Sequence, residues 1–163
     1  TTRQNALDMM CVGLAGRVAE AMVFGEMACT TGAEQDYKQV TAEAARYVRH
    51  LGFDGRISRT DVTLEMDNHI NTDVAPSNAA IEALLQTQYQ RAQALLSEHQ
   101  AALNALVSAL MEHGMIAQAE MQQLLQTQGL QIRTSAPLGA DETLVLEPFA
   151  QRLAQFQGQC AAR

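Results

Sequence analysis

Apolar side chains recur every three or four residues over most of this sequence, which is the spacing of one face of an α-helix. The pattern predicts helices at residues 3–24, 33–51, 78–97, 98–113 and 117–127. Ala, Leu, Gln, Glu and Met, which favour helix, are also plentiful. The sequence therefore predicts an all-α protein, a helical bundle of about five helices in which consecutive helices pack antiparallel.

The first predicted helix has clear ends and two glycines in its interior. Thr2 is placed to cap its start and Gly25 to stop it. Gly13 and Gly16 lie within the apolar pattern, where each costs about 1 kcal/mol relative to alanine. We therefore expect another element to pack closely against both glycines.

The second helix is preceded by Thr31-Gly-Ala-Glu34, which has the form of a capping box, and Gly52 ends it. Helical periodicity is then lost over residues 53–75. We expect one long surface loop there, with a short strand near residues 62–66. Loops of this length without regular structure are uncommon and often functional.

The last part of the chain follows a different pattern. Residues 135–141 contain Pro137 and Gly139 and resemble a linker. Glu147-Pro148 then starts an extra C-terminal helix, whose apolar face carries Phe149, Leu153 and Phe156. The sequence thus predicts a helical domain at 1–128 and a C-terminal extension at 129–163, which packs on its own core or docks a protein partner.

Charge and composition exclude several kinds of partner. The formal net charge is −7 and the basic residues are scattered singly, so neither nucleic acid nor an anionic membrane is expected as a partner. No apolar run approaches the roughly 18 residues of a spanning helix, and no signal peptide is visible. Cys11, Cys29 and Cys160 are odd in number and far apart, which favours a reduced, cytoplasmic setting.

Three segments occur close together and in a fixed order, at Leu14–Glu20, Val23–Glu26 and Thr30–Asp36. They resemble the "GGR-x-AEE", "FG" and "TTGA-x-x-D" stretches in the peptidase domain of the FtsH-family ATP-dependent zinc metalloproteases. Residues 42–53 and 89–96 are similar to two later helices of that domain. The resemblance covers about residues 5–126 and points to the C-terminal helical part of the domain.

The resemblance implies a zinc site and an oligomer. In such proteases two histidines of a His-Glu-x-x-His helix and a downstream aspartate bind zinc, and the glutamate is the general base. The aspartate ends "TTGA-x-x-D", which places Asp36 at the metal-ligand position of this chain. The family also implies a homo-oligomer, a hexamer.

The chain departs from the family in the residues that perform catalysis. It has four histidines, at positions 50, 69, 99 and 113, and none belongs to a His-Glu-x-x-His motif. No phosphate-binding loop of an ATPase module occurs either. We therefore assign no catalytic and no cofactor-binding residue. We expect no zinc to be bound by this chain alone, unless the loop His69 or oligomer contacts supply nitrogen ligands.

Simpler interpretations apply to several of these residues. An aspartate in the first turn of a helix, such as Asp36, often serves only the helix dipole. Arg17 and Glu20, three residues apart, are expected to form a local salt bridge. Cys11 lies on the apolar side of its helix and is expected to be inert.

Two functions remain open at this point. The chain is either a segment of a larger zinc protease, inactive by itself, or a stand-alone degenerate relative that acts in oligomerisation or as an adaptor. An upstream His-Glu-x-x-His would favour the first, and an initiator Met directly before Thr1 would favour the second.

Overall fold

A computed structural model describes residues 2–57 and 74–130 of the chain. Over these residues it contains five α-helices, two short 3-10 helices and no strand, which confirms the all-α prediction. The α-helices are α1 (Arg3–Phe24), α2 (Glu34–Arg49), α3 (Ala75–Glu98), α4 (Gln100–His113) and α5 (Gln118–Thr127). The 3-10 helices are η1 (Glu26–Ala28) and η2 (Thr31–Ala33). The predicted strand near 62–66 and the predicted helix after Glu147 lie outside the described residues.

The chain divides into two compact units, Thr1–Glu112 and His113–Arg163. The boundary predicted from the sequence, between residues 128 and 129, stays a prediction because residues 131–163 of the extension lie outside the described residues. None of the described helices is both long enough and apolar enough to cross a lipid bilayer.

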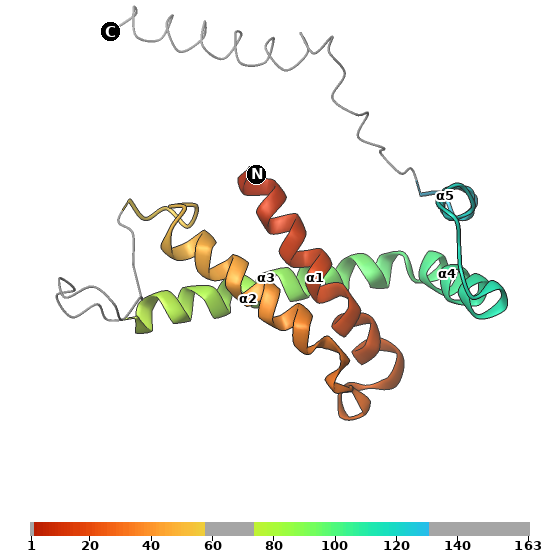
Figure 1. Ribbon diagram of the computed structural model, residues 1–163, viewed down its shortest axis with the longest axis horizontal. Coiled ribbons are helices and arrows are strands. Elements are labelled where there is room, and N and C mark those ends of the chain that lie inside the picture. Colours follow the sequence, from red (N-terminus) through yellow and green to blue (C-terminus); the bar gives the residue numbers. More distant parts are fainter. Residues whose placement is uncertain (1, 58–73, 131–163) are drawn as a thin grey trace, which may run out of the picture. The chain divides into compact units, whose positions relative to one another are not determined.

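The core of the first unit is built where α1, α2 and α3 pack on one another. Figure 1 shows α1 and α2 as a helical hairpin, with α3 crossing both. The main cluster of buried side chains draws on all three helices and comprises Ala6, Met10, Ala44, Tyr47, Val48 and Ile81. A second cluster joins α1 to α3 through Cys11, Val18 and Ala92. The antiparallel packing predicted for consecutive helices is thus seen in the α1–α2 hairpin, while α3 crosses it.

Polar contacts reinforce the same three-helix arrangement. Asp8 of α1 accepts a hydrogen bond from Arg91 of α3, 2.6 Å away. That bond is the main reason why the pKa of Asp8 lies below its ordinary value. The guanidinium of Arg49, the last residue of α2, donates to the Ser77 hydroxyl at 3.1 Å and thereby ties α2 to the start of α3.

The predicted ends of α1 are confirmed. The Thr2 hydroxyl accepts the backbone N–H of Asn5 at 3.2 Å. Gly25 follows the helix with φ of +83°, a backbone conformation that residues with a Cβ rarely adopt. Helix α2 ends at Arg49, two residues before the predicted end, and Gly52 with φ of +63° lies in the turn beyond it. That turn brings the Phe53 ring edge-on to Tyr47, with centroids 5.4 Å apart.

The predicted capping box before α2 is wrong. No side chain caps α2, whose N-cap residue is Ala33. The 3-10 helix η2 intervenes, and it is the Thr30 hydroxyl that accepts a backbone N–H, that of Gly32, at 3.3 Å. The side chain of Glu34 makes no hydrogen bond with Thr31, and its carboxylate instead lies 3.9 Å from the ammonium group of Lys38. The extra turn shifts the capping role from Thr31 to its neighbour.

The two interior glycines of α1 have opposite surroundings. A Cβ on Gly13 would lie 2.5 Å from the Cγ1 of Val40, so α2 packs closely against α1 there, as predicted. A Cβ on Gly16 would meet nothing within 4 Å. The prediction for Gly16 was wrong because this part of α1 borders an open concavity instead of another described helix.

Candidate functional site

Asp36 lies in the first turn of α2, where its exposed side chain borders two concavities that also share Gly16 of α1. One concavity, of about 560 Å³, lies between α1, the segment 30–33 and α4. The other, of about 720 Å³, follows the contact of α1 with α2. We call the two together the Asp36 groove. The single metal-ligating residue assigned from the sequence is thus placed at an open surface.

The walls of the Asp36 groove are largely apolar. Met9 and Val12 line one concavity, and Val23, Phe24 and Val107 line the other. These side chains are well exposed, with 69% of the surface of Phe24 accessible. An exposed apolar face of this extent usually marks an interaction site. The described part of the chain leaves this face of α1 uncovered.

Three residues, which we call the Thr30 clamp, fix the backbone that leads to Asp36. The carboxylate of Glu20 accepts the N–H of Thr30 at 2.8 Å. The guanidinium of Arg17 donates to the carbonyl oxygen of Thr30 at 3.0 Å and lies 3.3 Å from Glu20. Both backbone polar groups of Thr30 are therefore held by one ion pair on α1.

The clamp also perturbs the acidity of its own members. Hydrogen bonds from Thr30, and then the contacts with Arg17, hold the pKa of Glu20 below its ordinary value. Burial works against the charged form of Arg17, but neighbouring Cys29 and Glu20 outweigh it and raise the pKa of the guanidinium. Both side chains are therefore charged at neutral pH.

The predicted Arg17–Glu20 salt bridge is confirmed, but its contacts with Thr30 could not be predicted from the sequence. Those bonds join residues 13 and 10 positions apart, and no helical period links α1 to the turn after it. The only available signal was that both segments belong to the family-like stretches.

Asp36 offers one metal ligand, and the described residues around it do not complete a site. Its carboxylate has no hydrogen bond or ion pair with another described residue. Glu20 borders the same groove, but its two oxygens already accept from Thr30 and Arg17. Over residues 2–57 and 74–130, no three His, Cys, Asp or Glu side chains gather as metal ligands would. A catalytic zinc site takes three protein ligands, so zinc does not fit these residues alone.

The histidines do not change this picture. His50 follows the C-terminal end of α2, roughly 20 Å along the helix from Asp36 at about 1.5 Å per residue. His99 caps the end of α3, and His113 belongs to the other unit. The loop histidine His69, considered above as a nitrogen ligand, lies outside the described residues.

The cysteines of the described segments are free thiols. Cys11 is buried between α1 and α3, and burial raises the pKa of its thiol. A thiol that stays protonated is a poor nucleophile and a poor metal ligand. Cys11, placed on the apolar side of its helix by the sequence pattern, is thus buried, and its lack of reactivity stays a prediction that the raised pKa supports.

A comparison with protein families matches residues 1–124 to Peptidase family M41. Among curated proteins, an "ATP-dependent zinc metalloprotease YME1 homolog" from Schizosaccharomyces pombe is 33% identical over 124 residues, which are 76% of this chain and 18% of that protein. An "ATP-dependent zinc metalloprotease FtsH" from Thermus thermophilus is 31% identical over 134 residues, 77% of this chain and 21% of that protein. A protein of the same name from Synechococcus is 32% identical over 137 residues, with shares of 77% and 22%. The chain spans about a fifth of the length of these relatives.

Proposed function

Because the chain belongs to peptidase family M41, we propose that it is the C-terminal helical part of a zinc metallopeptidase domain, with Asp36 as one zinc ligand. The other ligands, and the general base, come from a His-Glu-x-x-His helix that the printed sequence does not contain. Asp36 and that helix would together hold the metal, and zinc bound there would supply water activation. The ATP dependence named in the relatives would likewise involve another module.

The observation that carries this proposal is the setting of Asp36. Its carboxylate is unpaired among the described residues and lies beside the uncovered apolar face of α1. An amphipathic helix with histidines at i and i+4 presents both imidazoles on one side. Such a helix, seated on the Asp36 groove through its apolar side, would bring both nitrogens toward the carboxylate. The Thr30 clamp would hold the segment before Asp36 in place.

The zinc assignment is tested on the gene product read upstream of Thr1, if a His-Glu-x-x-His is encoded there. We expect that protein to hold zinc stoichiometrically by elemental analysis, and Asp36→Asn to lower its zinc affinity by about tenfold or more. Glu34→Gln is the matched control, since it removes one charge from the same exposed turn of α2. Equal zinc affinity in the two variants would exclude Asp36 as a ligand.

We further propose that the polypeptide printed here has no peptidase activity alone. None of its four histidines belongs to a His-Glu-x-x-His motif, so the general base and two ligands are missing from the sequence. The purified chain should leave fluorescent casein intact at any zinc concentration. Cleavage that a chelator abolishes would contradict this proposal. A mock purification from cells without the gene controls for contaminating proteases.

One observation favours a second function, that of a degenerate relative acting in oligomerisation or as an adaptor. The family match ends at residue 124, so the remaining residues, to Arg163, have no counterpart in it. Such a protein would keep the helical scaffold in a reducing, cytoplasmic setting and would form a homo-oligomer or dock a protein partner. The mass in solution, measured together with metal content, separates the two functions. A metal-free monomer would count against assembly, and stoichiometric zinc would favour catalysis.

A further inference from the structure

A third concavity in the first unit shares no lining residue with the two that form the Asp36 groove. It has a volume of about 360 Å³ and lies where α1, α2 and α3 meet, next to η1. Its lining includes Tyr37, Tyr89, Glu26, Glu82, Leu14 and Leu85. We call it the tyrosine cleft. The function proposed above uses one residue of its lining, Arg17 of the Thr30 clamp, and not the cleft itself.

Aromatic and aliphatic side chains form part of the walls of the tyrosine cleft, beside polar and charged ones. Leu14 is buried, with only 3% of its surface accessible. Tyr37 is 41% exposed and Tyr89 is half-buried, so both present ring surface to a ligand. Neither hydroxyl hydrogen-bonds to another described residue. The cleft thus combines apolar surface with unused polar groups, as ligand sites do.

The charges around the tyrosine cleft favour a cation. The carboxylate of Glu26 has no hydrogen bond or ion pair with another described residue, and that of Glu82 accepts only from the side-chain amide of Gln86, at 3.0 Å. The one cationic side chain in the lining, Arg17, is already occupied by Glu20 and Thr30. Two carboxylates are therefore available to a ligand, and among the described lining residues no unpaired cation opposes it.

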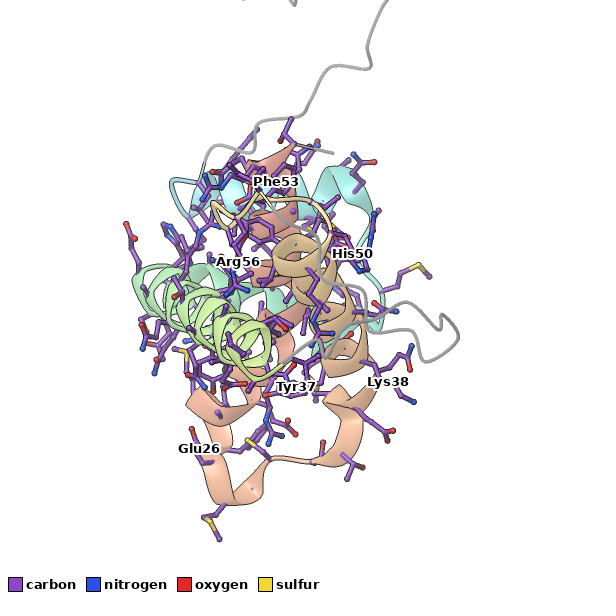
Figure 2. All side chains as sticks on the ribbon, turned by 90° about the vertical axis from the view of Figure 1, so that its left-hand side faces the viewer. Glu26, Tyr37, Lys38, His50, Phe53 and Arg56 are labelled. Atoms are coloured by element: carbon purple, nitrogen blue, oxygen red, sulfur yellow. The ribbon has the colours of Figure 1, made fainter. Side chains whose placement is uncertain are left out.

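The electrostatic neighbourhood of Tyr89 agrees with this view. Burial is the first cause that raises the pKa of its hydroxyl, and the negative charge of Glu26 is the second. The two side chains therefore lie within electrostatic reach of each other although they come from α3 and η1. Figure 2 shows Tyr37 and Glu26 in the lower half of the view, away from His50 and Phe53 at the other end of α2.

We propose that the tyrosine cleft binds an arginine side chain of an extended peptide. A planar guanidinium can stack on a tyrosine ring and donate two parallel hydrogen bonds to a carboxylate. Its aliphatic stem would contact Leu14 and Leu85. A lysine ammonium lacks the planar shape, an anionic side chain would be repelled, and a neutral one would leave the carboxylates without a partner. The cleft is thus a recognition point for polypeptide that is independent of zinc.

The test exploits the fact that the chain has only three tyrosines. The full chain, carrying ring-labelled tyrosine, is titrated by NMR with the capped tripeptide Ala-Arg-Ala. The ring signals of Tyr37 and Tyr89 should shift together along one saturable curve. Those of Tyr47 should not, because this ring is buried in the core and its hydroxyl accepts a bond from Arg3. Tyr47 is therefore an internal control for general effects of the peptide.

Two comparisons isolate the charge. The same tripeptide with citrulline, a neutral side chain of the arginine shape, should bind roughly tenfold more weakly. Glu26→Gln and Glu82→Gln should each weaken binding of the arginine peptide by about two- to fivefold, as expected for accessible ion pairs. Glu34→Gln, on α2 but outside the cleft, should bind as the unchanged chain does.

Several results would overturn the proposal. One is that the ring signals of Tyr37 and Tyr89 do not shift, and another is that the citrulline peptide binds as tightly as the arginine peptide. A third is that Glu26→Gln and Glu82→Gln bind the arginine peptide as tightly as the Glu34→Gln control does. Tyrosine signals that depend on protein concentration without peptide would assign the cleft to a second copy of this chain instead. The readout contains no metal and no catalytic step, so it stands or falls separately from the zinc proposal.

Discussion

At the scale of single residues, Thr30 shows how one ion pair can organise a turn. Its N–H and its carbonyl oxygen are both taken up by side chains of α1, at 2.8 Å from Glu20 and 3.0 Å from Arg17. Hydrogen bonds to charged groups are stronger than those between neutral groups. The position at which α2 starts, and with it the place of Asp36, depends on this contact.

The clamp makes a prediction about pH. The pKa of Glu20 lies below its ordinary value of 4.5 in the folded chain. Its charge therefore contributes stability that is fully present above that value and is lost as the pH falls through the lowered pKa. Glu20→Gln should be less stable than the unchanged chain at neutral pH, and the two should converge in acid. Urea unfolding followed by circular dichroism over a pH series measures this.

The matched control for that series is Glu34→Gln. Glu34 has 77% of its side chain exposed and lies 3.9 Å from Lys38, so its removal should change stability little at any pH. A constant difference between Glu20→Gln and the unchanged chain down to the most acid pH would show that the charge of Glu20 is not what stabilises the turn.

At the scale of elements, the hairpin of α1 and α2 depends on a close approach at one point. Gly13 allows Val40 to contact the backbone of α1, whereas Gly16, one turn later, borders the open Asp36 groove. The same residue type on one helix thus has a packing role in one place and none in the other. The two ends of α1 are also determined by single residues, its start by the cap of Thr2 and its end by Gly25.

The two glycines give a matched pair of substitutions. Gly13→Ala places a Cβ 2.5 Å from Val40 and should destabilise the chain by about 1–3 kcal/mol. Gly16→Ala meets no atom within 4 Å and should stabilise it by up to about 1 kcal/mol through higher helix propensity. Chemical denaturation of both variants measures the sign of each change in the free energy of unfolding. Equal effects would mean that the approach of Val40 does not limit the packing of the hairpin.

The helix pattern and the family-like segments accounted for the elements but not for every contact. Periodicity predicted all five described helices, and the apolar faces of α1, α2 and α3 meet in a core. The predicted capping box at Thr31 was wrong because a 3-10 turn, which a four-residue motif does not predict, moved the capping role to Thr30. Gly13 and Gly16 were indistinguishable in sequence because only the path of α2 separates them. Asp36 was found through the resemblance alone, and its role as a ligand stays a prediction.

At the scale of the whole molecule, stability is concentrated in part of the chain. Helix α1 buries five residues, whereas α4 buries only Ala102 and α5 buries none. Apolar side chains of α4, among them Leu110 and Met111, are exposed. The family match nevertheless extends through α4 and most of α5. The described chain is thus a well-packed three-helix core followed by helices with little burial of their own.

This distribution predicts a gradient of local unfolding. Backbone amides open most readily where few side chains are buried. In a hydrogen-exchange experiment on the full chain, amides of α4 and α5 should exchange well before those of α1, α2 and α3. Core amides near Met10 and Val48 supply the slow reference. Protection of α4 equal to that of α1 would show that something outside the described contacts covers α4.

The Thr30 clamp has a practical consequence for the stretch that it encloses. Glu20 and Thr30 are bonded across ten positions of sequence, so the end of α1, η1 and the residues that follow it form a segment that is closed at its base. Met27, near its tip, is fully solvent-accessible. Added length at a closed, exposed tip costs little free energy. A fluorophore or affinity tag inserted after Met27 would therefore give a handle on the molecule that leaves the approach to Asp36 unchanged.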